Sequence, residues 1–397
     1  MRNVGTVVRG IRTPVIKEHD NLENVVIESL MKAKESEGFE FKDKDIVAIT
    51  EAVVGITEGN YATVDEIAND IKQKFPSGEL ALVFPSPFSR NRFGILLKGI
   101  ARAMNKITIC MSYPKDEEGN SLFNEELLEK YNINPYSTLL EEDEYNKYFG
   151  NEVHIFTGIN YVKYYKELVT NENCLVKFIF TNQAKEALKY SKNCLVANIH
   201  NRFKTKKILK ENGAEIVYGT DEILTKPING SGYNSKYGLL GSNKATEEKV
   251  KLFPEHGDIL VNNIQKKLKE LTGKDIEVMV YGDGAFKDPI GGIWELADPV
   301  VSPAYTKGLE GTPNELKLKF LSDNKFTNLK GEELIKAMKE EIKNKDSNLK
   351  GQMATQGTTP RRFVDLIGSL CDLTSGSGDK GTPVVYIQGY FDNYAND

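Results

Sequence analysis

Short apolar runs alternate with helix-like segments between residues 79 and 225, and this alternation restricts the possible folds more than any other pattern in the chain. The apolar runs, each long enough for one buried strand, lie at 80–84, 107–111, 153–156, 176–180, 195–199 and 215–218. Segments with helical spacing separate several of them, at 90–104, 160–169, 182–191 and 202–212. Such alternation is typical of βαβ units, so we expect an inserted α/β subdomain with some parallel sheet over residues 79–225.

The flanking parts, residues 1–78 and 226–397, have a more mixed pattern. Their periodicity predicts strands at 4–16, 46–50, 276–281 and 383–388, and helices at 21–36, 63–75 and 360–372, with a solvated helical hairpin at 314–345. Asp20 is the candidate N-cap of the first helix, and the acidic stretch 115–150 is expected to be poor in helix. The whole pattern predicts an α+β fold with mixed sheets.

Composition excludes several classes of protein. The net charge of −5 gives no basic footprint for nucleic acid. Membrane spans need about 20 consecutive apolar residues, and no run in the chain approaches that length. The N-terminus lacks a signal-peptide layout, so we expect a cytoplasmic protein. The four cysteines form no CxxC pair and the four histidines show no zinc-site spacing, which favours buried thiols over a zinc centre.

An acidic, glycine-rich loop follows the strand predicted at 276–281. Asp283 beside Gly284, and then Asp288, place carboxylates on backbone that can approach a ligand closely, and hard cations prefer such oxygen ligands. Asp283 is the first candidate metal ligand, Asp288 the second and Glu51, at the end of another buried strand, the third. Alternatively, the loop is a plain turn after a strand, Asp288 caps a turn, and Glu51 pairs with a lysine.

Two basic clusters begin helix-like segments, with Arg90 and Arg92 in one and Arg361 and Arg362 in the other. The helix dipole opposes cations in a first turn, so arginines there indicate an anion to be held. Their planar guanidinium groups suit phosphates and carboxylates, although solvated surface arginines are the alternative.

Four segments, in preserved order, resemble the coenzyme F-420:glutamate γ-ligase family. Residues 10–22 (GIRTPVIKEHDNL) and 47–59 (VAITEAVVGITEG) are similar to the family's I-K-E-G-D-D-L and V-x-T-E-K-V-V-x-x-x-E-G elements. Within residues 238–284, the pieces GLLGSN, LFP, LTGK and GDG parallel G-I-D-x-S-N, L-L-P and L-T-G-K…D-T. Residues 376–389 (GSGDKGTPVVYIQG) parallel G-E-G-G-D-x-x-P-V-V-x-x-R-G. The segment 79–225 is not part of the resemblance.

The resemblance implies an enzyme that uses GTP, or ATP, with Mg²⁺ or Mn²⁺ to join L-glutamate through a γ-linked amide to a small carboxylate acceptor by way of an acyl phosphate. It also implies a two-domain architecture interlaced as a homodimer, with residues 1–78 and 226–397 forming the ligase-like part. Asp283, Arg361 and Arg362 are then candidate catalytic residues. The candidate nucleotide-binding residues are Ser242 and Asn243 of the S-N element, Gly284, and Asp379 in the loop before the last strand. Alternatively, Ser242 and Asn243 are plain turn residues, and the loop of Asp379 is a structural turn.

The chain departs from the family pattern at three positions. Leu240 stands where the family has a metal-binding Asp, Ala52 where it has a Lys, and Gly282 where a strand-end Asp is expected, with Asp283 one residue later. These changes and the insert suggest an acceptor other than the deazaflavin coenzyme, with a folate as one option. A non-catalytic nucleotide- or metabolite-binding relative is the alternative. In a further alternative the insert itself binds a small molecule at its strand ends, although it has no GxGxxG or Walker A motif.

Overall fold

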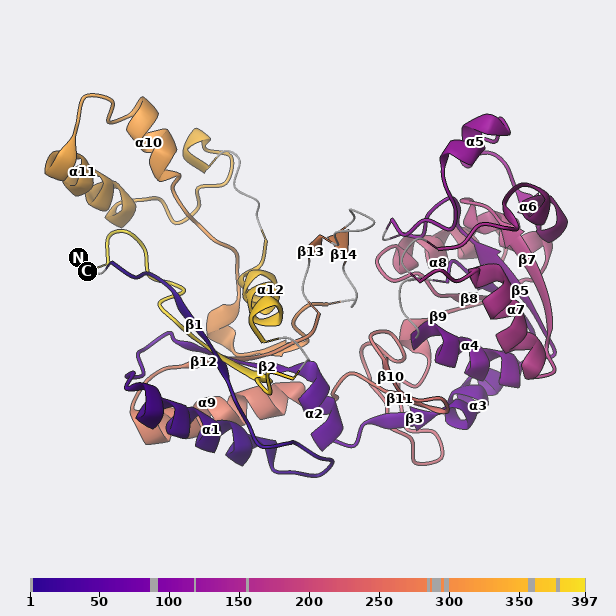
Figure 1. The fold of residues 1–397 in the computed structure, drawn as a ribbon, viewed down its shortest axis with the longest axis horizontal. Helices are drawn as coiled ribbons and strands as arrows, with labels where there is room; N and C mark the ends of the chain where they lie inside the picture. The colour runs from indigo at the N-terminus through magenta and orange to yellow at the C-terminus, as the bar shows by residue number, and fades with distance from the viewer. Residues whose placement is uncertain are drawn as a thin grey trace.

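The computed structural model describes residues 3–85, 92–117, 119–154, 157–283, 286–287, 294–295, 300–355, 361–375 and 379–396. Figure 1 shows two lobes joined by a narrow waist. Both lobes combine helices with sheets, so the predicted mixture of α and β structure is confirmed. In the described part of the chain, no helix is long and apolar enough to cross a membrane.

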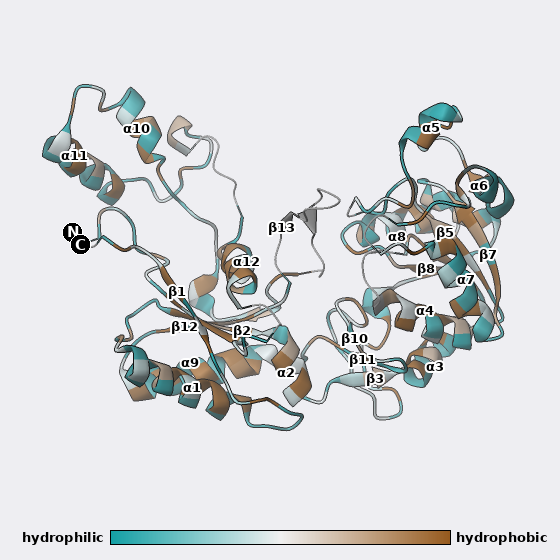
Figure 2. Cartoon of the chain, in the orientation of Figure 1, coloured by the Kyte–Doolittle hydropathy of each residue, from teal (hydrophilic) through white to brown (hydrophobic). Residues whose placement is uncertain are grey.

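The first lobe contains a five-stranded sheet in the order β1-β16-β2-β12-β15, with bounds Val7–Ile11, Val384–Gln388, Ile46–Thr50, Glu277–Tyr281 and Ala304–Tyr305. Strands β2 and β12 are parallel, and the other neighbours are antiparallel. Helices α1 (Leu22–Glu37) and α9 (Gly257–Thr272) cover one face of this sheet, and α12 (Phe363–Ser375) covers the other (Figure 1). Figure 2 shows apolar residues concentrated on the strands and on the helix faces that meet them.

Local signals in the sequence account for the ends of α1. The side chain of Asn21 accepts a hydrogen bond from the Asn24 N–H and is the N-cap, one residue after the predicted Asp20. Asp20 instead accepts a bond from the backbone N–H of Lys17. Gly38 ends the helix with a φ of 67°, a conformation that glycine adopts without steric cost.

The second lobe contains a six-stranded sheet in the order β6-β7-β5-β4-β8-β9, with bounds Leu140–Glu141, Leu175–Phe180, Lys106–Met111, Glu79–Val83, Asn193–Val196 and Ile216–Gly219. All neighbours are parallel except β6 with β7, which confirms the predicted parallel sheet. One face packs on α3 (Val64–Lys74), α4 (Arg92–Ala103) and α7 (Tyr161–Asn171), and the other on α8 (Arg202–Glu211) and the 3₁₀ helix Ala184–Lys189.

The stretch 115–150 is not poor in helix. It forms α5 (Glu126–Lys130) and α6 (Glu142–Phe149), and the prediction there was wrong. Tyr145 and Phe149 of α6 are buried in the lobe's core, where Tyr145 stacks on Phe180 of β7. Helices this short are not stable alone, so tertiary packing rather than sequence periodicity determines whether they form.

A three-stranded sheet forms the waist, in the order β10-β11-β3, with bounds Asn243–Thr246, Lys249–Lys251 and Tyr61–Thr63. Ala62 and Leu252 of this region belong to the core of the second lobe, so that core extends beyond residues 79–225 on both sides. Short 3₁₀ helices also span Thr220–Glu222, Lys307–Leu309 and Met353–Thr355. The remaining α-helices and strands are α2 (Glu51–Thr57), β13 (Phe286–Lys287), β14 (Trp294–Glu295), α10 (Leu318–Asn324) and α11 (Gly331–Lys343). The last two form the expected helical hairpin, joined by a Lys325–Glu341 ion pair of 2.7 Å.

Candidate functional site

The candidate site lies at the carboxyl ends of β2 and β12, the parallel pair at the centre of the first sheet. Their register places Thr50 beside Tyr281. Glu51 and Asp283, which follow these two residues, therefore leave the sheet at the same edge. Asp283 is half-buried, and the N–H of Gly282 before it donates to the Val301 carbonyl at 2.7 Å.

The loop that carries Asp379 reaches the same edge. Strand β16 starts at Val384, opposite Ile49, and the Thr50 N–H donates to the Pro383 carbonyl at 3.0 Å. Since β16 runs antiparallel to β2, the residues before β16 lie beyond the carboxyl end of β2. Asp379 is exposed there. The fold thus brings carboxylates from three distant parts of the sequence to one edge.

Glu51 is held by the waist hairpin, whose strands β10 and β11 are defined above. Its side chain is 7% exposed and lies 3.5 Å from the Lys251 ammonium, Nζ to Oε2. Asn243 Nδ2 donates to the other carboxylate oxygen at 3.1 Å, and Lys251 Nζ donates to the Ala52 carbonyl at 3.2 Å. Asn243 and Lys251 lie opposite each other on β10 and β11. Together their side chains contact both carboxylate oxygens of Glu51.

Lys251 was not singled out from the sequence. It stands in a short run between Glu248 and Leu252 that has no motif, and only the pairing of β10 with β11 directs its side chain to Glu51. The sequence signal available was the buried strand end at Glu51, which needs either a cation or a ligand when its carboxylate is enclosed.

Ser242 is 1% exposed, and its hydroxyl has no hydrogen-bond partner among the described residues. It lines a cavity of about 20 Å³ together with Thr220, whose hydroxyl also lacks a described partner. A cavity of that size holds one water molecule, which would satisfy both hydroxyls. Leu240 is 5% exposed and forms part of the apolar wall of the same cavity, which explains why an apolar residue is tolerated where the resembling family has Asp.

The two arginines precede α12 and are exposed. Arg362 forms a bidentate pair with Asp365, at 3.0 Å from Nε and 2.8 Å from a terminal nitrogen, and this pair raises the pKa of Arg362. The side-chain hydrogen bonds described for Arg362 are thus to Asp365 of α12, and a role of Arg361 and Arg362 at the strand edge stays a prediction.

A divalent cation fits this edge only in part. Within the described ranges, no three or more His, Cys, Asp or Glu side chains gather as a metal site. A cation bound by Glu51 would lie next to the buried Lys251 ammonium and be repelled by it. Asp283 offers hard oxygen donors at the same edge, which suits Mg²⁺ or Mn²⁺. Gly284 and Asp288, the other predicted residues of this loop, lie outside the described residues.

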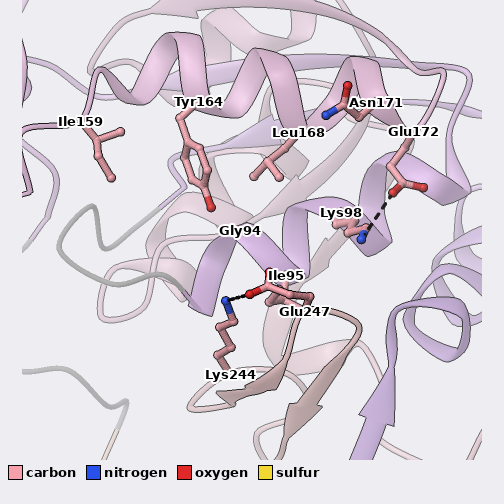
Figure 3. A pocket seen from close by; sticks show the side chains of 10 residues that line it. All are labelled: Gly94, Ile95, Lys98, Ile159, Tyr164, Leu168, Asn171, Glu172, Lys244 and Glu247. Carbon is pink, nitrogen blue, oxygen red and sulfur yellow. Dashed lines mark hydrogen bonds and ion pairs between the residues drawn. The ribbon is translucent and has the colours of Figure 1, made fainter.

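A second cavity, of about 300 Å³, lies where the waist hairpin meets α4 and α7 (Figure 3). The charged side chains that line this cavity form ion pairs, Lys244 with Glu247, and Lys98 with Glu172 at 4.0 Å. Opposite charges that neutralise each other leave no net field for an anion. This cavity is therefore a less suitable nucleotide site than the strand edge at Asp283.

Comparison with known proteins supports the resemblance found in the four segments. A search of curated protein sequences found no significant match. The sequence model of the family described as F420-0:gamma-glutamyl ligase matches residues 10–389, nearly the whole chain. The chain belongs to the F420-0:gamma-glutamyl ligase family.

Proposed function

We propose that the protein is a nucleotide- and metal-dependent ligase that adds L-glutamate through a γ-linked amide to a small carboxylate acceptor. Family membership supports the ligase class. One structural observation supports the proposal: Asp283, which follows β12, and Asp379, which precedes β16, lie at the edge of the sheet where β2 ends, beside the hairpin that carries Ser242 and Asn243. That edge gathers the residue types needed to bind a nucleoside triphosphate.

The reaction we propose has two steps. The γ-phosphate of GTP or ATP passes to an oxygen of the acceptor carboxylate, which gives an acyl phosphate and the nucleoside diphosphate. The amine of glutamate, having lost a proton, then attacks the acyl carbon. A C–N bond forms, the C–O bond to the phosphate breaks, the nitrogen loses a second proton to become the amide, and inorganic phosphate leaves. A divalent cation bound when the site is loaded supplies neutralisation of the phosphate charge.

We assign roles to the chain's own residues on this basis. Asp283 would hold the cation, together with Asp288. Gly284, after β12, and Asp379, in the loop before β16, would border the nucleotide. Asn243 and Lys251 fix Glu51, so we assign Glu51 to positioning the hairpin rather than to metal. Arg361 and Arg362 are exposed, and we assign them to binding an anionic group of the nucleotide or acceptor.

The test is turnover of purified protein with GTP or ATP, Mg²⁺ or Mn²⁺ and glutamate, against a panel of acceptors that includes the deazaflavin coenzyme precursor and a folate. We expect glutamate-dependent release of phosphate and a product enlarged by one glutamate. Asp283→Asn should abolish turnover, whereas Asp323→Asn, an exposed residue of α10, should not change it. If no acceptor supports phosphate release, the proposal fails.

Two observations favour a second candidate, a nucleotide- or metabolite-binding relative without catalysis. Leu240 lies in an apolar wall where the family pattern has a metal-binding Asp, and the Glu51 carboxylate is paired with Lys251, so neither position supplies a free metal ligand. A metal-dependent rise of the melting temperature with GTP, combined with no phosphate release, would favour this reading. Detectable glutamate-dependent phosphate release would exclude it.

A further inference from the structure

The second lobe is a doubly wound sheet with one point where the winding reverses. The parallel strands lie side by side in the order β7-β5-β4-β8-β9. Along the chain, β5 and β7 are added on one side of β4, and β8 and β9 are then added on its other side. The helices divide accordingly, with α4 and α7 on one face and α8 on the other. In open parallel sheets, ligands bind beyond the carboxyl ends of the strands at such a reversal, here between β4 and β8.

A cavity of about 340 Å³ opens at that point, and we call it the switch-point cavity. Four of its lining residues lie one or two positions beyond the carboxyl ends of parallel strands: Phe84 after β4, Ser112 after β5, Asn182 after β7 and Asn198 after β8. Its volume lies at the lower end of the range for small-molecule sites.

Asn198 supplies an unpaired polar atom in this wall. Its side chain is 3% exposed, and Nδ2 donates to the Thr205 hydroxyl at 3.1 Å. The amide oxygen, Oδ1, has no hydrogen-bond partner among the described residues. A buried acceptor without a donor is costly, so the cavity is chemically matched to a ligand that brings a hydroxyl or N–H group.

An anion position adjoins Asn198 at the N-terminus of α8. The first turn of α8 has no acidic residue, and Lys204 in that turn lines the cavity and contacts no described carboxylate. Backbone N–H groups of Ile199, His200 and Asn201 all donate to the carboxylate of Glu117, the last two at 3.0 and 3.2 Å. Glu117 comes from the loop after β5, so the chain's own carboxylate fills a position that favours negative charge.

The other acidic residue of the wall does not oppose an anion strongly. Asp116 is 6% exposed, and its two oxygens accept bonds from the backbone N–H and the side-chain amide of Asn120, each at 2.9 Å. These bonds hold both Asp116 oxygens toward Asn120 of the same loop, and Lys204 supplies a cation in the same wall.

We propose that the switch-point cavity binds a small phosphate monoester bearing hydroxyl groups, and that Glu117 occupies the phosphate position in the free protein. A phosphate dianion has three oxygens that can accept hydrogen bonds from the three N–H groups and from Lys204. A hydroxyl group of the ligand would donate a hydrogen bond to Asn198 Oδ1, which otherwise has no described partner. The site lies in the other lobe from the ligase edge and does not depend on the ligase chemistry. Binding exchanges one carboxylate for one phosphate, with no covalent step.

The test is calorimetric titration with ribose 5-phosphate, in the absence of nucleoside triphosphate and glutamate. Glu117→Gln keeps the size of the side chain and removes its charge. The charged Glu117 carboxylate competes with the ligand phosphate for the three N–H groups more strongly than a neutral glutamine does, because charge-assisted hydrogen bonds are stronger than neutral ones. We therefore expect the variant to bind ribose 5-phosphate about tenfold more tightly than wild type. Ribose without phosphate should bind neither protein detectably.

Two lysine variants control the result. In the Glu117→Gln background, Lys204→Met should remove the increase in affinity for ribose 5-phosphate. Lys210→Met, in the last turn of the same helix, should leave that increase unchanged. Ribose 5-phosphate binding no tighter to Glu117→Gln than to wild type, or a gain that survives Lys204→Met, would overturn the proposal. If Glu117→Gln does not fold, weaker binding to Lys204→Met than to Lys210→Met in the wild-type background supports it, and equal binding overturns it.

Discussion

Removal of the Lys251 ammonium should destabilise the protein strongly, because it leaves the buried Glu51 carboxylate without this cation. The side chains of Lys251 and Glu51 are only 9% and 7% exposed, and Nζ lies 3.5 Å from Oε2. At that distance, an effective dielectric constant of about 20 gives an attraction of about 5 kcal/mol. Mutations that break buried pairs by removing one partner cost about 3–5 kcal/mol. We therefore expect Lys251→Met to lower the free energy of unfolding by about 3–5 kcal/mol.

The assay is urea unfolding followed by far-ultraviolet circular dichroism at neutral pH, for both single variants and the double variant. Lys251→Met with Glu51→Gln should regain most of the loss, since no charge is then left buried. Lys249→Met is the matched control from the same strand. Lys249 lies over the Tyr61 ring at 4.2 Å, and its loss should cost about 1 kcal/mol or less.

Two outcomes would refute this reasoning. One is a loss for Lys251→Met no larger than that for Lys249→Met. The other is a double variant as unstable as Lys251→Met, because the penalty would then arise from lost packing rather than from the unpaired carboxylate. A positive result would also explain how the hairpin that carries Ser242 and Asn243 is fixed to the edge of the first sheet.

Two further predictions concern the cores of the two lobes. Burial raises the pKa of Asp45, which is 1% exposed and accepts bonds from Lys42 N–H at 2.7 Å and from Gln388 at 3.3 Å. Its contribution to stability is therefore fully present below the unfolded pKa of about 3.9 and is lost as pH rises through the higher folded pKa. Melting temperatures measured from about pH 4 to pH 7 should show wild type losing stability relative to Asp45→Asn as pH rises, and a constant difference would contradict this assignment. In the second lobe, a Cβ at Gly99 would lie 2.6 Å from Ile67 Cγ2 and 2.9 Å from Ile67 Cβ, where α4 crosses α3. Gly99→Ala should cost about 1–3 kcal/mol by overpacking despite the better helix propensity of alanine, and a variant as stable as wild type in urea would show that α3 can move.

Much of the local structure follows from the sequence because its causes lie within a few residues. The apolar runs at 80–84, 107–111 and 176–180 became β4, β5 and β7, since a buried strand needs only a short β-branched stretch between turn residues. Helix ends such as Gly38 and Gly273 follow from the conformational freedom of glycine. Where a helix is too short to be stable alone, as in α5 and α6, periodicity gave the wrong answer.

The sequence alone was sufficient to predict the family, most of the buried strands and longer helices, and the acidic residues that follow two of those strands. The contacts of Lys251 and Asn243 with Glu51, about 200 positions away, depend on the tertiary structure, as do the hydrogen bonds of Glu117 to the backbone N–H groups of residues 199–201 before α8. The physical reason is that these contacts depend on strand order and register. Periodicity encodes which face of an element is buried, but not which neighbour covers it.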